Sequence, residues 1–156
     1  MSNFQSLPHF WPELILTTTI LISIIADLVY APRDSAKTRF WVFGGLILTL
    51  FALRMSDGTL VTTLFMDSIA LDPFAKFFKI VIVLATVLIL FISSKSDELK
   101  GHRIGEYYIL IGIMVFGMFL MVSSIDMIMV YLAIEIVSIM SFILAGYLKQ
   151  ELSSSE

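Results

Sequence analysis

Five apolar runs alternate with short polar segments along the chain. A transmembrane helix needs about 20 predominantly apolar residues, because the hydrocarbon core of a bilayer is roughly 30 Å thick. Most of the runs approach that length, and the second, which ends near Arg54, is the shortest. The pattern predicts an all-α, polytopic membrane helical bundle of about five transmembrane helices, over approximately Trp11–Tyr30, Phe40–Leu53, Phe74–Ser93, Tyr107–Val122 and Met127–Tyr147.

Polar residues that favour helix starts stand at the head of several of these runs. Asp72 is a suitable N-cap, with Pro73 at the first helical position. Glu13 lies in the first turn of the first run, and Asp126 directly precedes the fifth. For all three acids we predict a capping role or a favourable contact with the helix dipole.

Lysines and arginines in the short loops indicate how the bundle is oriented. Loops on the cytoplasmic side of a membrane carry an excess of these residues. The second loop holds only Arg54 against Asp57 and Asp67, whereas the first and third loops hold Arg33, Lys37, Arg39, Lys95, Lys100 and Arg103. The charge pattern predicts an N-terminus outside the cytoplasm and a cytoplasmic C-terminus.

A polar segment, residues 94–105, separates two parts of the chain and is predicted to be a cytoplasmic linker. Residues 1–93 form a predicted N-terminal three-helix region with long loops between its helices. In residues 106–156 only a few residues join the last two helices, so we expect an antiparallel two-helix hairpin followed by a polar tail.

Composition supports a membrane protein and excludes several kinds of site. The chain is 58% hydrophobic, and its mean hydropathy of +0.96 is too high for an ordinary soluble domain. It has no cysteine, which excludes disulfides, thiolate zinc sites and cysteine-ligated iron–sulfur clusters. The net charge of -3 comes with no basic patch, so no nucleic-acid partner is expected. Three methionines recur at helical spacing, Met114, Met118 and Met121. No histidine or cysteine accompanies them, so we expect them to be packing residues and expect no metal site.

Glu135 is the candidate of greatest chemical interest. It lies in the fifth run, roughly 12 Å from the outer end at 1.5 Å per residue, where a central charge costs about 2.5–3.5 kcal/mol on insertion scales. At that depth the carboxyl group must be protonated, paired or in contact with a hydrated cavity. Tyr131 and Ser138 share its helical face, so their hydroxyls are candidates for hydrogen-bond support. The residues predict an intramembrane proton-relay acid; the alternative is a neutral glutamate hydrogen-bonded to a neighbouring helix.

Three further ionisable residues lie in or beside the apolar runs. For Lys79, near the outer end of the third run, a relay role and a lysine that snorkels to the interface are equally open. Glu106 opens the fourth run, where stabilisation of the helix start is favoured over a part in proton transfer. Asp27 lies close to the basic first loop and is interpreted as an interfacial charge.

The segment "GEYYILIGIMVFGMFLMVSSIDMIMVYLAIEIVSIMSFILAGY" closely resembles the fourth and fifth helices of subunit N of the proton-pumping NADH–quinone oxidoreductase, respiratory complex I. Sister antiporter-like subunits usually have a tryptophan before the fifth-helix glutamate, whereas this chain has Ile134, which favours subunit N. Upstream, Pro12–Leu14, Asp27 and Asp72–Lys79 are also similar to this subunit. The segment's matching positions are Gly105 to Tyr108, Gly117 and Met118, Ser124 to Asp126, Glu135, and Ala145 to Tyr147.

This resemblance implies a place in a larger antiporter-like fold, with residues 106–156 as the start of its first repeat. It implies a proton-translocating subunit without a redox active site, in which Glu135 is the relay acid that pairs with a lysine of a later helix, and Glu106 contributes. NADH, flavin, iron–sulfur clusters and quinone are then expected in other subunits. The expected partners are other membrane-arm subunits, especially neighbouring antiporter-like ones, with lipid and protons, in the bacterial cytoplasmic (inner) membrane.

The sequence departs from the family pattern where it stops, before the family's sixth helix. We therefore expect an N-terminal fragment or one piece of a split subunit. Two alternative functions are a subunit of a related cation/proton antiporter or membrane-bound hydrogenase, and a non-transporting membrane scaffold. In the scaffold, Glu135 would only donate a hydrogen bond between helices.

Overall fold

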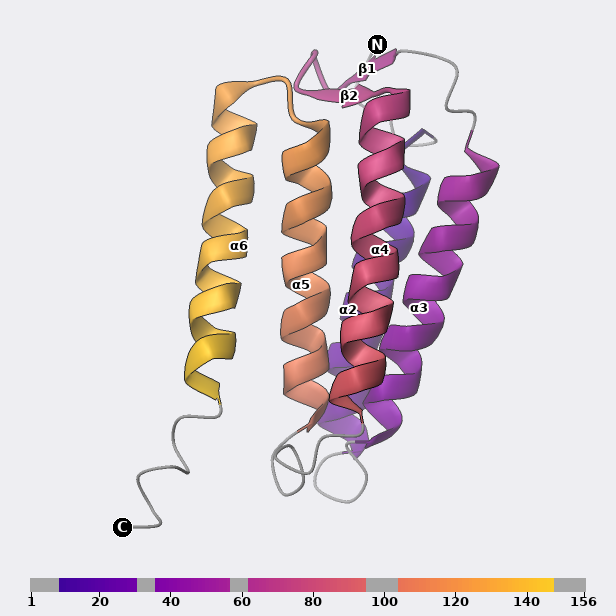
Figure 1. Cartoon of the computed structure of the whole chain (residues 1–156), viewed down its shortest axis with the longest axis vertical. Helices are drawn as coiled ribbons and strands as arrows, with labels where there is room; N and C mark the ends of the chain where they lie inside the picture. The colour runs from indigo at the N-terminus through magenta and orange to yellow at the C-terminus, as the bar shows by residue number, and fades with distance from the viewer. Residues whose placement is uncertain (1–8, 31–35, 57–61, 95–103, 148–156) are drawn as a thin grey trace.

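The computed structural model describes residues 9–30, 36–56, 62–94 and 104–147, which form five helices and one small hairpin (Figure 1). All five helices are long and apolar enough to cross a membrane, as the hydrophobic pattern predicts. In chain order the elements are α2 (Trp11–Tyr30), α3 (Ala36–Met55), β1 (Thr62–Leu64), β2 (Ile69–Leu71), α4 (Pro73–Ser93), α5 (Ile104–Ser123) and α6 (Met127–Tyr147).

The predicted ends of α2 and α6 agree with the structure, whereas α3 is longer at both ends than predicted. The prediction followed the apolar run from Phe40 to Leu53, but the helix also includes Lys37 and Arg39 before it and Arg54 after it. An apolar run marks the part of a helix that fits hydrocarbon, and a helix continues into the polar interface as long as its backbone bonds are satisfied.

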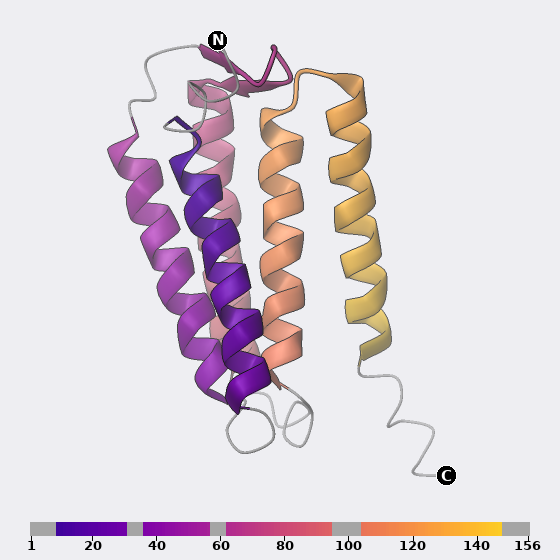
Figure 2. The same cartoon turned by 180° about the vertical axis from the view of Figure 1, so that it is seen from behind.

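The helices run alternately in opposite directions, so α2 begins and α6 ends at opposite ends of the bundle (Figures 1 and 2). The side of the membrane on which each end lies stays a prediction. Lys37 and Arg39 belong to described residues, but Arg33, Asp57, Lys95, Lys100 and Arg103, which also carried the orientation argument, lie outside them. The division at residues 94–105 also stays a prediction, although α5 packs against α2, α3 and α4 as well as α6.

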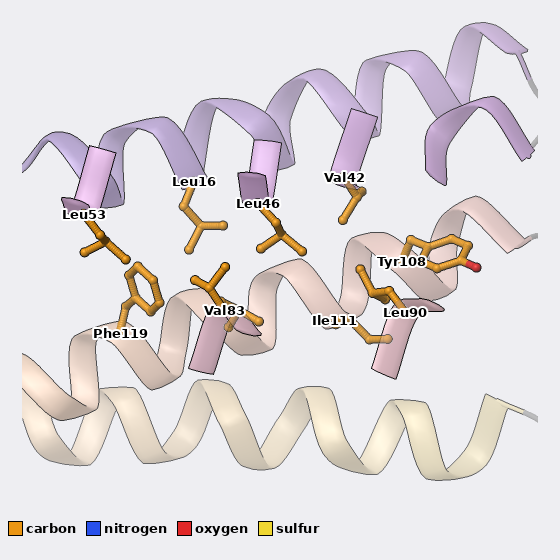
Figure 3. Close-up of a cluster of buried hydrophobic side chains, with 10 residues drawn as sticks. Leu16, Val42, Leu46, Leu53, Val83, Leu90, Tyr108, Ile111 and Phe119 are labelled. Carbon is orange, nitrogen blue, oxygen red and sulfur yellow. The ribbon is translucent and has the colours of Figure 1, made fainter. Parts of the chain in front are cut away.

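The core lies between α2, α3, α4 and α5. Its largest buried cluster draws Leu16 from α2, Leu46 from α3, Val83 from α4 and Phe119 from α5, with six further residues of these helices (Figure 3). In the described part of the chain, α6 adds none of this cluster's fully buried members. Its main packing partner is α5, and its buried Ala133 joins a smaller cluster with Leu64 and Ile69 of the hairpin. The bundle is therefore four helices around a core, with α6 at its edge (Figure 2).

A small β-hairpin, which the sequence analysis did not predict, closes one end of the bundle. β1 and β2 pair antiparallel, and the turn between them holds three residues with positive φ, Phe65, Met66 and Asp67. The backbone N–H of Ile125 donates to the Ser68 carbonyl at 3.0 Å, which joins the hairpin to the α5–α6 turn. Three-residue strands are too short to give a readable alternation, so the sequence pattern did not indicate them.

Two of the predicted helix caps are confirmed. Asp72 accepts a hydrogen bond from the backbone N–H of Ala75 at 2.6 Å, and Pro73 follows it in the first turn of α4. Asp126 accepts from the N–H of Ile128 at 3.3 Å at the start of α6. These acids satisfy backbone donors that the helix itself leaves unpaired.

Candidate functional site

A buried ion pair joins α2 to α4. The ammonium group of Lys79 donates a hydrogen bond to Glu13 Oε1, across 66 residues of sequence. The two side chains are only 3% and 1% exposed, so the interpretation of Lys79 as a lysine that snorkels to the interface is wrong. Glu13 does lie in the first turn of α2, as predicted, but its carboxylate also neutralises a buried cation.

Sequence reasoning named Lys79 and missed its partner. A usable signal was present, because Lys79 lies on the same helical row as the residues that α4 buries: Ala75, Val83, Thr86 and Leu90. A lysine on the buried row of an apolar helix requires a negative partner from a neighbouring helix. Glu13 is an acid in the first turn of another apolar helix, and Phe119 of α5 adds a cation–π contact, its ring centroid 5.8 Å from Lys79 Nζ.

A cavity of about 40 Å³ lies beside this pair, close to the β-hairpin end of the bundle. Glu13 Oε2 is buried and has no hydrogen-bond partner among the described residues. The polar residues that line the cavity are His9, Glu13, Ser56, Asp72, Lys76 and Lys79. Lys76 is anchored there by a hydrogen bond from its ammonium group to the Ser56 carbonyl. The site thus combines a paired lysine, a carboxylate with one oxygen that lacks a hydrogen-bond partner among the described residues, and a small cavity beside them.

Glu135 lies in the opposite environment, in the middle of α6 and exposed. Its helical row is exposed as well and otherwise apolar or aromatic: Ile128 is 67%, Tyr131 64%, Ile139 45% and Phe142 76% exposed. In the described part of the chain, α6 buries only Ala133. The carboxyl group therefore points away from the four-helix core.

The predicted hydroxyl support of Glu135 is not formed within the described residues. No hydrogen bond joins Glu135 to Tyr131 or Ser138 there, and Ser138 instead accepts a bond from Ser141 through its carbonyl, at 2.8 Å. A shared helical face brings side chains near one another, but on an open face nothing holds Tyr131 against the acid. Any strong partner of Glu135 must come from outside these residues.

Asp27 and Glu106 lie at the end of the bundle away from the hairpin. Asp27, interpreted as an interfacial charge, is 8% exposed and accepts a hydrogen bond from Thr38 Oγ1 at 3.0 Å, so it is buried against α3. Gly105 makes this arrangement possible, because a Cβ atom there would lie 1.7 Å from Asp27 Oδ1. Glu106 is half-buried in the first turn of α5, where a carboxylate stabilises the helix start.

The structure also bears on the metal predictions. Over the described ranges, no group of three or more His, Asp or Glu side chains is arranged to hold a metal ion. Met114, Met118 and Met121 are half-buried, and the last two pack against buried apolar clusters. This placement agrees with their interpretation as packing residues.

Nearly the whole chain is similar in sequence to membrane subunits of one group of known proteins. No protein-family model matches the chain. It is 38% identical to NADH-quinone oxidoreductase subunit N 2 of Chloroherpeton thalassium, over 94% of the chain and 29% of that protein. It is 34% identical to NADH-quinone oxidoreductase subunit N of an Anaeromyxobacter species, over 99% of the chain and 30% of that protein. F(420)H(2) dehydrogenase subunit N of Methanosarcina mazei is 28% identical, over 97% of the chain and 32% of that protein.

The chain thus spans about a third or less of the length of the curated relatives it matches. The similarity nevertheless extends from its first helix to its last, and it agrees with five helices suited to a membrane. Along nearly its whole length, this chain is a homologue of part of subunit N of NADH-quinone oxidoreductase, as the resemblance in the sequence predicts.

Proposed function

We propose that the chain is part of a membrane-arm subunit of a respiratory NADH–quinone oxidoreductase and takes part in proton translocation coupled to quinone reduction. The observation that carries this proposal is the 34–38% identity to subunits N over at least 94% of the chain. An ionisable carboxyl group in the middle of an apolar helix supports it, since such groups mark proton and ion pathways. In this role the chain moves protons, and NADH, flavin, iron–sulfur clusters and quinone belong to other subunits.

Glu135 is the proposed relay acid. On an open lipid-facing surface its charge costs about 2.5–3.5 kcal/mol, so the exposed row of α6 requires protein or water beside it. In the proposed complex that surface lies against a further segment of the antiporter-like fold, which supplies a lysine and a hydrated path. The carboxylate then takes a proton from water on one side and returns it on the other.

The proposed orientation places the hairpin end of the bundle outside the cytoplasm, in a bacterial inner membrane. Lys37 and Arg39 begin α3 at the other end, while Asp67, Asp72 and Asp126 gather at the hairpin end. The support for this orientation is the count of basic residues in the short loops, as the positive-inside rule requires. The first and third loops hold Arg33, Lys37, Arg39, Lys95, Lys100 and Arg103, whereas the hairpin end has Arg54, Lys76 and Lys79. Other membrane-arm subunits, above all neighbouring antiporter-like ones, are the proposed partners.

Glu135→Gln tests the relay role, because it keeps the shape and hydrogen bonding of the side chain and removes the ionisable proton. In everted membrane vesicles we expect the number of protons taken up per NADH oxidised to fall several-fold, with assembly on native gels unchanged. Ser141→Ala, on the same helix, is the matched control and should pump like the parent. Normal pumping by Glu135→Gln would instead favour the non-transporting scaffold.

A second candidate function is proton translocation in a complex with a different electron donor. The Methanosarcina mazei relative is named a subunit of F(420)H(2) dehydrogenase, so related membrane subunits occur with another electron donor. Membrane-bound hydrogenases and cation/proton antiporters belong to the same group of alternatives. Purifying the assembly through a tag on this chain and assaying NADH, reduced deazaflavin and hydrogen as electron donors separates them.

A further inference from the structure

The buried pair of Glu13 and Lys79 is incomplete in a way that indicates a ligand. Lys79 satisfies only Oε1 of the carboxylate, and Oε2 is buried without a partner among the described residues. An ionised carboxylate that loses water from one oxygen without gaining a hydrogen bond is strongly disfavoured. The geometry therefore requires a small hydrogen-bond donor at Oε2.

The adjoining cavity has the size and lining for water. Its volume of about 40 Å³ exceeds the roughly 10–15 Å³ that one water molecule needs by this measure, so it holds on the order of three. Buried water also needs two to four polar neighbours. Glu13, Lys79, Ser56, Asp72 and Lys76 supply them, and His9 lines the same space.

Lys79 has a second contact besides Glu13. Its ammonium group faces the Phe119 ring at 5.8 Å, and this cation–π contact does not depend on the charge of Glu13. If the Glu13 carboxylate were protonated, Lys79 would lose its ion-pair partner but keep its contact with the Phe119 ring. A pair built in this way tolerates a change of protonation better than one enclosed only by aliphatic residues.

We propose that Glu13 and Lys79 form a second, hydrated proton-exchange site of this chain, with water as its ligand at Glu13 Oε2. A hydronium ion in the cavity transfers a proton to Oε2: an O–H bond forms on the carboxyl group, one breaks in hydronium, and water is left. Lys79 keeps its own protons throughout. The exchange role rests on the proposed translocation function, but the hydration of the site does not.

The position of the pair fits this role. Lys79 lies about 9 Å along α4 from Pro73, and Glu135 lies about 12 Å along α6 from Met127, at 1.5 Å per residue. Both helices begin at the hairpin end, with α5 between them (Figure 1). The buried pair and the exposed acid thus stand at similar depth on two sides of α5, which carries Phe119.

Hydration is tested by thiol labelling in the assembled complex, because the chain has no cysteine of its own. Ala75 and Val83 lie on one buried row of α4, but only Ala75 lines the cavity. A single cysteine at each position is treated in membrane vesicles with methanethiosulfonate ethylammonium, a charged reagent that needs an aqueous path. We expect a mass increase of the chain for Ala75→Cys and none for Val83→Cys; equal labelling of both, or none at Ala75→Cys, overturns the proposal.

Proton exchange is tested with the double variant Glu13→Gln/Lys79→Gln, which removes both charges and so leaves no unpaired ion. We expect it to assemble and to take up several-fold fewer protons per NADH than the parent. An assembled variant with unchanged proton uptake overturns the exchange role, and if assembly fails, absence of labelling at Ala75→Cys still overturns it, because exchange requires water at the site. Glu135→Gln, measured alongside, reports separately on the proposed function: normal pumping there, with labelled Ala75→Cys, rejects the proposed function and leaves the hydrated site standing.

Discussion

Glu13 and Glu135 are both acids of apolar helices, but the protein treats them in opposite ways. Glu13 is 1% exposed and paired with a lysine of the same chain, while Glu135 is exposed and has no ion-pair partner among the described residues. The helices that carry these two acids differ in burial in the same way. α2 is a member of the four-helix core, whereas α6 buries only Ala133.

This difference separates a charge that is neutralised within the bundle from one that is left unpaired among the described residues. The bundle of α2 to α5 neutralises its buried cation internally, so the pair contributes to the bundle whether or not other proteins are present. The α6 surface has a carboxyl group at membrane depth with nothing in the described residues to satisfy it. That surface is therefore suited to a partner, and changes there should affect function far more than folding.

Breaking the buried pair should give the largest effect on stability. Lys79→Met leaves the Glu13 carboxylate buried and uncompensated, so we expect the free energy of unfolding to fall by about 3–5 kcal/mol. The measurement is unfolding by sodium dodecyl sulfate in mixed micelles, followed by circular dichroism. The double variant Glu13→Gln/Lys79→Met should recover most of the loss. A loss below about 1 kcal/mol for Lys79→Met would contradict the buried pairing of Glu13 and Lys79.

A second change inside the core should cost less. Gly105→Ala places a Cβ atom 1.7 Å from Asp27 Oδ1, so Asp27 must shift and its hydrogen bond to Thr38 is lost. Overpacking of this kind costs about 1–3 kcal/mol. Gly44→Ala is the matched control, because a Cβ atom there meets nothing within 4 Å; in a helix interior it should stabilise by up to about 1 kcal/mol. Equal unfolding midpoints for the two variants would contradict the close approach of Asp27.

The sequence was sufficient for features that depend on local chemistry. An acid followed by proline is a local helix-start signal, and Asp72 caps α4 as predicted. The ends of α2 and α6 follow from the length of their apolar runs. The depth of Glu135 needs only its position in α6. Each of these features involves residues close together in the chain, so none depends on how the helices pack.

Features that depend on packing could not be predicted in this way. The partner of Lys79 is 66 residues away, and only the crossing of α2 and α4 brings the two together. Asp27 is buried because Gly105, on α5, lets a helix approach it closely. The outward face of Glu135 was also unpredictable, because α6 is apolar all round and its sequence does not fix which side meets α5.

A smaller effect is expected where α6 meets the core. At Gly117 of α5, a Cβ atom would lie 2.9 Å from Ile136 Cγ2, 3.0 Å from Val137 Cγ2 and 3.2 Å from Ile136 Cβ. These atoms lie close to the backbone of stiff β-branched residues, so α6 itself must move slightly away from α5. We expect Gly117→Ala to cost about 1 kcal/mol, at the low end of overpacking. Hydrogen exchange should quicken for the amides of α6 and not for those of α2. Equal quickening in both helices would show that α6 unfolds only together with the core.

The smallest change in stability is expected at Glu135 itself. Glu135→Leu replaces an exposed carboxyl group by a side chain that matches its apolar neighbours, so the free energy of unfolding in micelles should change by no more than about 0.5 kcal/mol. The same variant should lower proton uptake by the assembled complex as strongly as Glu135→Gln, since both remove the ionisable group. Stability without pumping would place this acid among the groups that the assembly needs. A loss of about 2 kcal/mol or more would mean that Glu135 has a folding partner within the chain.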